Sequence, residues 1–170
     1  SSWYGYKEFT GNAIGDPLTL TATRERITRL LRAEVERLGG GGSVYLGGLS
    51  QGCTAALDVY LREAPRLGLG GFVGSVGFFP SDELGFRGAD AAMGRLAADA
   101  GQARRPIWLQ CAVDDREDVP WSLVRSSLKR PEAKLPGLGV RKVSGRGHQI
   151  WEWEADYLKE FLRTHAKGAY

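Results

Sequence analysis

The sequence predicts an α/β fold built around a mainly parallel sheet. Short apolar runs alternate with amphipathic stretches along the 170 residues, which is typical of repeated strand–helix units. Hydrophobic residues make up 42% of the chain and charged residues 25%, as in an ordinary globular protein. The 24 glycines, about twice the usual share of ~7%, indicate many tight turns or close backbone approaches. On a prior of ~150 residues per domain, residues 1–170 form a single domain.

The first part of the chain predicts a helix, a strand and a second helix. Residues 1–17 show no periodicity, and we expect a loop there. A helix over 21–38 is indicated by apolar residues that share one stripe: Ile27, Leu30, Leu31, Val35 and Leu38. The glycines at 39–42 predict a helix terminator, with a flexible linker as the alternative. A strand is then predicted over 43–48 and a helix over 51–63.

The rest of the chain repeats this alternation of strands and helices. Three further strands are predicted over 70–77, 106–112 and 138–144, and three helices over 90–100, 120–130 and 150–164. Connections between parallel strands are almost always right-handed. The sequence therefore predicts a doubly wound layer of four strands.

Composition excludes several classes of protein. Lys and Arg number 23 against 20 Asp and Glu, and a net charge of +3 is too weak to favour nucleic-acid binding. Two cysteines exclude a disulfide scaffold, no zinc-ligand spacing occurs, and no glycine-rich phosphate loop follows a strand, so we expect no metal and no cofactor. The most apolar stretch, 67–79, is broken by glycines and predicts no membrane span. Without a basic-then-apolar leader, the expected location is cytoplasmic.

The pattern with the most chemical content is Gly48-Leu49-Ser50-Gln51-Gly52, at the junction of a predicted strand and a predicted helix. A serine on such a turn is forced into strained dihedrals, and the flanking glycines let neighbouring backbone pass closely. The strain exposes the hydroxyl, and the helix that starts there directs N–H groups at a nearby oxyanion. We therefore predict Ser50 as a nucleophile and the Gln51 N–H as an oxyanion donor. A serine helix cap is the alternative.

A serine nucleophile needs a base, and the chain has two histidines. His148 follows the fourth predicted strand, where a strand–helix loop lies at the same sheet edge as Ser50. His165 lies at the end of the last predicted helix, and we expect a surface residue there, favoured by the helix C-terminus. His148 is therefore the predicted base.

The base needs an orienting carboxylate, and three acids come just after the third predicted strand: Asp114, Asp115 and Asp118. The chain order of serine, acid and histidine is the one that α/β-hydrolases use. We predict Asp115, with Asp114 as the alternate, because the end of a strand cannot be assigned to one residue from sequence. The other acids are expected to be solvated or to lie near the N-terminus of the next helix.

Two cysteines lie close to these residues in the sequence. Cys53 begins the helix after Ser50, where a thiol pKa can be lowered, and Cys111 ends the strand before the acids. Buried, unreactive thiols are the favoured interpretation.

Aromatic and apolar residues near the predicted triad are candidates for substrate contact. Trp151 and Trp153 follow the predicted base and have the size to wall an acyl or aromatic pocket, although helix–sheet packing explains one of them equally well. We expect Trp151, Leu49 and Phe79 to contact the substrate.

Five segments, in order and over nearly the whole chain, carry a family resemblance. Residues 44–52 look like a nucleophile strand and elbow, 75–80 a strand end, 114–120 an acid loop and 147–162 a histidine loop with the last helix; residues 2–4 look like the segment before the helix that precedes the elbow. Together they resemble the phospholipase/carboxylesterase group, which contains the acyl-protein thioesterases. The resemblance implies an α/β-hydrolase-type three-layer sandwich and a serine hydrolase acting on small carboxylic esters or thioesters without a cofactor.

The sequence departs from this family in ways that bear on function. The family's opening strands and its His-Gly oxyanion loop precede the counterpart of residues 2–4, so the resemblance implies an N-terminally truncated sheet. We expect residues 11–16 to be a candidate substitute donor, and a second copy or a complementary chain to cover the open sheet edge. Cys111-Ala112 stands where the family has His-Gly. A non-catalytic binding or scaffold protein of the same fold is the alternative function; a lactone-opening enzyme is disfavoured, because Ser50 stands where a cysteine nucleophile is expected.

Overall fold

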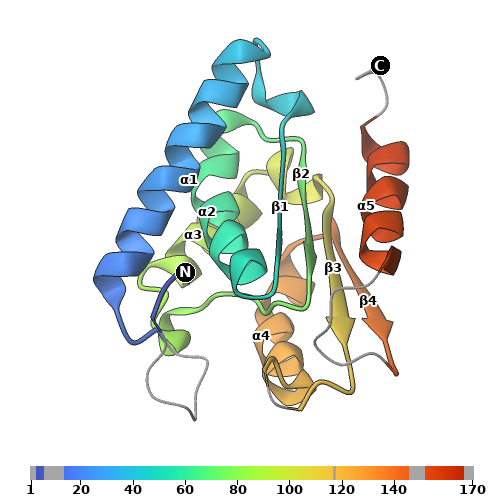
Figure 1. Cartoon of the computed structure of the whole chain (residues 1–170). Coiled ribbons are helices and arrows are strands. Elements are labelled where there is room, and N and C mark those ends of the chain that lie inside the picture. Colours follow the sequence, from blue (N-terminus) through green and yellow to red (C-terminus); the bar gives the residue numbers. More distant parts are fainter. Residues whose placement is uncertain (1–2, 6–13, 117, 146–151, 167–170) are drawn as a thin grey trace.

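A computed structural model describes residues 3–5, 14–116, 118–145 and 152–166. Its sheet has four parallel strands that lie side by side in chain order (Figure 1): β1 (Tyr45–Leu49), β2 (Gly71–Ser75), β3 (Ile107–Ala112) and β4 (Leu138–Val143). The predicted α/β class with a mainly parallel sheet is confirmed. In the described sheet β1 is an edge strand, and the partner expected to cover it stays a prediction.

The described residues also form five α-helices, one before β1 and four after it: α1 (Pro17–Arg37), α2 (Gln51–Leu67), α3 (Ala89–Ala98), α4 (Trp121–Lys134) and α5 (Glu152–His165). Helix α1 begins earlier than predicted because Asp16 caps it, accepting the N–H groups of Leu18 and Thr19. Helix α2 runs beyond residue 63 and stops at Gly68, whose φ of 64° is left-handed. The start of α1 and the end of α2 are therefore set by local capping, which the spacing of apolar residues does not reveal.

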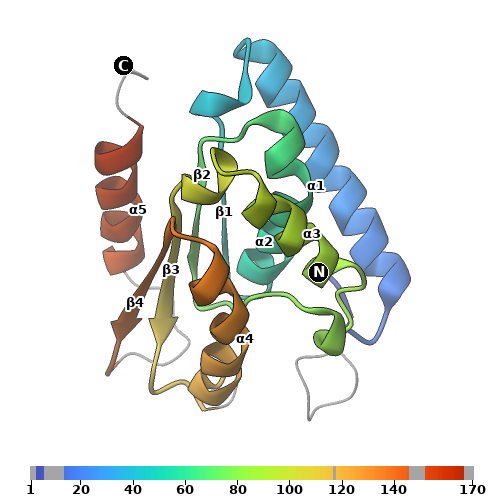
Figure 2. The ribbon, with the colours of Figure 1, turned by 180° about the vertical axis from the view of Figure 1, so that it is seen from behind.

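The helices lie on both faces of the sheet and make three layers (Figures 1 and 2). Helices α1 to α4 share one large buried cluster with the strands, whereas α5 packs on the other face. There, Tyr157 and Phe161 of α5 contact Val73 of β2 and Trp108 of β3. No described helix is long and apolar enough to cross a bilayer.

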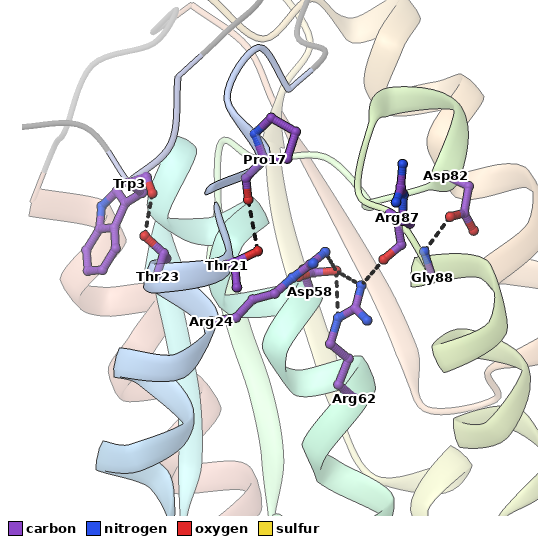
Figure 3. Close-up of polar contacts among 10 residues, drawn as sticks. All are labelled: Trp3, Pro17, Thr21, Thr23, Arg24, Asp58, Arg62, Asp82, Arg87 and Gly88. Carbon is purple, nitrogen blue, oxygen red and sulfur yellow. Dashed lines mark hydrogen bonds and ion pairs between the residues drawn. The ribbon is translucent and has the colours of Figure 1, made fainter. Parts of the chain in front are cut away.

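Asp58 of α2 is a fully buried charge between two arginines (Figure 3). Arg24 of α1 donates from Nε to its carboxylate at 2.6 Å, and Arg62 of α2 donates from Nη2 at 2.9 Å. The same nitrogen of Arg62 donates to the carbonyl of Arg87 at 2.9 Å, just before α3. The carboxylate therefore joins α1, α2 and the turn before α3.

Replacing Asp58 by alanine is expected to destabilise the fold by about 3–5 kcal/mol, because two partly buried guanidinium groups lose their counter-charge. Urea denaturation followed by circular dichroism measures the change. Glu34→Ala is the matched control: it removes a carboxylate from an exposed pair with Arg37, and the unfolding midpoint should not move. A loss below about 1 kcal/mol for Asp58→Ala would contradict the structural role of this carboxylate.

Candidate active site

Ser50 occupies the sharp turn between β1 and α2. Its backbone has φ 55° and ψ −129°, a left-handed conformation that is strained for any residue other than glycine. A Cβ on Gly48 would clash with the carbonyl of Gly52 and lie 2.7 Å from the nitrogen of Cys53. The strained turn predicted from the sequence is therefore present, and glycine is required at position 48. The Ser50 hydroxyl makes no cap hydrogen bond to α2, which argues against the alternative of a simple helix cap.

The elbow is also tied to the neighbouring strand. The N–H of Ser50 donates to the carbonyl of Ser75 at 2.9 Å, and Ser75 is the last residue of β2. The next residue, Val76, is the other described non-glycine residue with positive φ, at 45°, and its N–H donates to the carbonyl of Gln110 at 2.8 Å. β-Branched residues rarely adopt a positive φ. The sequence therefore gives no sign that the backbone of Val76 is strained. Backbone strain thus falls at the carboxyl ends of two adjacent strands.

Gln51 has a structural role that the sequence analysis missed. Its side-chain oxygen accepts the N–H of Trp3 at 2.8 Å, and its amide nitrogen donates to the carbonyl of Tyr4 at 2.7 Å. The Trp3 indole also lies beside Gly52, with its nitrogen 3.0 Å from where a Cβ would stand. The amide therefore holds residues 3–4 against the elbow, and Trp3, 45% exposed, is a further aromatic side chain beside the elbow at Gly52.

The three candidate acids follow β3 at the same edge of the sheet as Ser50, because all four strands are parallel (Figure 1). Asp115 is 5% exposed, and its carboxylate accepts the N–H groups of Asp118 at 3.1 Å and Val119 at 3.0 Å. Asp114 is exposed and accepts the N–H of Gly145 at 2.6 Å, just after β4. Asp118 is exposed. Of the three acids, Asp115 is the one held in a fixed, buried position.

Two predicted site residues, His148 and Trp151, lie outside the described residues. The other histidine does not match its prediction. His165 is partly buried against Trp108 and Phe161, with ring centroids 5.0 and 5.1 Å apart. Burial lowers the pKa of His165, so packing outweighs the expected stabilisation of its charge by the helix C-terminus. The expectation of a surface histidine was wrong.

The predicted substrate contacts have different surroundings. Leu49 lines a groove of about 540 Å³ between the ends of β1 and β2 and helix α5, together with Ser75, Glu154 and Leu158. Phe79 is 1% exposed and packs in the core, with its N–H bonded to Ser127 Oγ at 3.0 Å. Its side chain therefore offers no surface to a substrate, which corrects the expectation. Trp153 lies in the first turn of α5.

Residues 14–16 belong to the stretch expected to supply a substitute oxyanion donor, and their backbone N–H groups already have hydrogen-bond acceptors. The N–H of Ile14 donates to Leu84, and the N–H groups of Gly15 and Asp16 both donate to the carbonyl of Gly5. Residues 11–13 lie outside the described part of the chain. Residues 14–16 are therefore not oxyanion donors in this conformation.

Both thiols are buried and unreactive, as favoured. Burial, with a smaller contribution from Cys111, raises the pKa of Cys53 above the usual thiol range. Burial raises the pKa of Cys111 to about 12. A helix start does not make Cys53 a nucleophile here, because desolvation of the thiolate dominates. In the described part of the chain, no three His, Cys, Asp or Glu side chains gather as a metal site requires.

Several solved structures are similar to this chain over nearly all of its length. Acyl-protein thioesterase 2 from Zea mays is 19% identical, with a TM-score of 0.69 over 97% of this chain and 72% of that chain. A phospholipase/carboxylesterase from Dyadobacter fermentans is 23% identical, with a TM-score of 0.70 over 95% and 71% of the two chains. SOBER1 from Arabidopsis thaliana is 17% identical, with a TM-score of 0.69 over 98% and 74%. No protein-family model and no curated protein sequence matches the chain.

The fold is therefore similar to that of the solved acyl-protein thioesterase and phospholipase/carboxylesterase structures. The resemblance seen in the sequence motifs is confirmed for the fold. This chain covers 72% of the Zea mays thioesterase, so the similar region is most but not all of that protein. At these identities the likeness concerns the fold, and the function is argued from the site.

Gly48→Ala is expected to destabilise the protein by about 1–3 kcal/mol, because the new methyl group must displace the backbone of the elbow. Gly94→Ala in α3 is the matched control: nothing lies within 4 Å of its Cβ position, and alanine should stabilise the helix by about 0.5–1 kcal/mol. Thermal unfolding of both variants measures the difference. Equal stability of the two variants would contradict the tight backbone crossing at Ser50.

Proposed function

We propose that this protein is a serine hydrolase that cleaves carboxylic esters or thioesters through an acyl-enzyme on Ser50. The observation that carries the proposal is the strained Ser50 at the start of α2, with close-packed glycines on either side. A nucleophile on such a turn is presented at the carboxyl edge of the sheet rather than buried in it. The α/β-hydrolase fold of the thioesterase and carboxylesterase structures supports the same class of reaction.

The proposed mechanism uses three side chains and the start of α2. His148 takes the proton of Ser50 Oγ as the oxygen attacks the acyl carbonyl, and the N–H of Gln51 donates to the oxyanion that forms. His148 then gives the proton to the departing alcohol or thiol. Water, deprotonated by the same imidazole, attacks the acyl-enzyme and releases the acid, which restores the serine hydroxyl.

Asp115 is the proposed partner of the imidazole. Its burial and its two backbone N–H donors fix the carboxylate in one orientation. The two oxygens of a carboxylate accept about four hydrogen bonds, so these donors leave capacity for an imidazole N–H. Asp114 is exposed, and a solvated carboxylate holds an imidazole less firmly.

The first test is labelling with a fluorophosphonate probe, which reacts with activated serines. We expect one adduct per chain on Ser50, located by peptide mass spectrometry, and none on Ser50→Ala. The probe needs no knowledge of the natural substrate. Absence of any adduct on folded wild-type protein would instead favour a non-catalytic binding or scaffold protein with this fold.

The second test separates the two neighbouring acids. Asp115→Asn should lower the rate of p-nitrophenyl ester hydrolysis by about 10²–10⁴-fold, because the amide no longer holds the imidazole in the required tautomer. Asp114→Asn is the matched control and should retain activity within about threefold, because that carboxylate is exposed and bonds the N–H of Gly145. The reverse order of effects would assign the role to Asp114.

A further inference from the structure

The carboxyl end of β2 holds a polar contact that the proposed triad does not use. Ser75 is 6% exposed, and its Oγ donates to Oε1 of Glu154 at 2.9 Å. Glu154 is the third residue of α5, so this bond joins the sheet to the first turn of the helix. Both residues line the groove between β1, β2 and α5.

Ser75 also holds the nucleophile elbow through its backbone. Its carbonyl accepts the N–H of Ser50 at 2.9 Å, and in the sheet Ser75 is paired with Leu49, the residue before Ser50. Ser75 therefore contacts the elbow with its main chain and α5 with its side chain. Ser75 thus links Ser50 to Glu154 through two hydrogen bonds, each 2.9 Å long.

Beyond its first turn, α5 contacts the sheet through polar bonds from Arg141 and Tyr45 and through apolar packing. Further along the helix, Tyr157 and Phe161 pack on Trp108, with ring centroids 5.8 and 5.5 Å apart. Apolar packing is non-directional and changes little when a helix slides or rotates slightly, whereas a hydrogen bond restricts both distance and angle. The Ser75–Glu154 bond is thus a directional contact between the first turn of α5 and the sheet.

We propose that the Ser75–Glu154 hydrogen bond is a positioning device that sets where the segment carrying His148 meets Ser50; this rests on the function proposed above. His148 precedes the first residue of α5, Glu152, by four positions, a span of at most about 14 Å. Holding the first turn of α5 therefore restricts the region that the imidazole can reach. A displacement of about 1 Å between reacting groups can cost about 10²-fold in rate.

The test uses variants that break the bond and variants that keep it. Ser75→Ala and Glu154→Ala remove the donor and the acceptor, while Ser75→Thr keeps the hydroxyl and Glu154→Gln keeps an accepting oxygen. Glu160→Ala is the matched control, because it breaks another contact between α5 and the sheet, from Arg141 at 2.9 Å, further along the helix. Circular dichroism and thermal unfolding establish that each variant is folded.

We expect Ser75→Ala and Glu154→Ala to lower kcat for a p-nitrophenyl ester by about 10-fold to 100-fold, with KM changed by less than about threefold. Ser75→Thr and Glu154→Gln should restore at least half of the lost activity, and Glu160→Ala should match wild type. The double variant Ser75→Ala/Glu154→Ala should be no slower than Glu154→Ala alone, because the bond can be lost only once. Wild-type kcat in both alanine variants, or full additivity of their effects, would overturn the proposal.

A second readout does not depend on activity. The chain has two histidines, so the imidazole signals of His148 and His165 can be followed separately by NMR as pH is varied. Ser75→Ala should shift the titration midpoint of His148 and leave that of His165, which is packed on Trp108, unchanged. If wild type fails to label with the fluorophosphonate probe, the proposed function fails. A shifted His148 midpoint would then still support the positioning role, and an unmoved one would overturn it.

Discussion

The left-handed backbone of Ser50 is the constraint on which the rest of the arrangement depends. Strand β1 ends at Leu49 and helix α2 begins at Gln51, so one residue reverses the chain from strand to helix. That reversal brings the carbonyl of Gly52 against the α-carbon of Gly48, which leaves no room for a side chain there. The cost of the strained φ is met by α2, whose buried face packs against α1 and α3. A well-packed helix on one side and a hydrogen-bonded strand on the other can hold a conformation that the local sequence disfavours.

The two buried carboxylates show how the same residue type serves stability in one place and chemistry in another. Asp58 is compensated by two guanidinium groups, which neutralise its charge and link three elements. Asp115 accepts two backbone N–H groups, from Asp118 and Val119, which orient its carboxylate. Asp58 thus links three elements of the fold, whereas Asp115 is held in one orientation at the edge of the sheet that carries Ser50.

The sequence predicted the features that are decided locally and missed those decided by distant packing. The elbow could be predicted because glycine spacing and a strand–helix junction lie within five residues, and the four strands because short, mostly apolar runs alternate with helical stretches. Phe79 and His165 were misjudged because their surroundings come from far along the chain: Ser127 bonds the backbone of Phe79, and Trp108 packs on the ring of His165. The start of α1 was misplaced for a different reason. Asp16-Pro17 is a recognisable cap, but the apolar stripe used to place the helix begins later.

Among the described helices, α5 is the one that packs on the face of the sheet opposite α1 to α4. Its first and last turns contact the sheet in different ways. At its last turn, the Tyr45 hydroxyl donates to the carbonyl of His165 at 2.7 Å, and the aromatic rings of Trp108, Phe161 and His165 pack together. At its first turn a hydrogen bond from Ser75 to Glu154 connects it to the strand beside the nucleophile. The end of α5 that leads into the segment carrying His148 is thus also held by a directional contact, and this contact comes from the residue that bonds the backbone of Ser50.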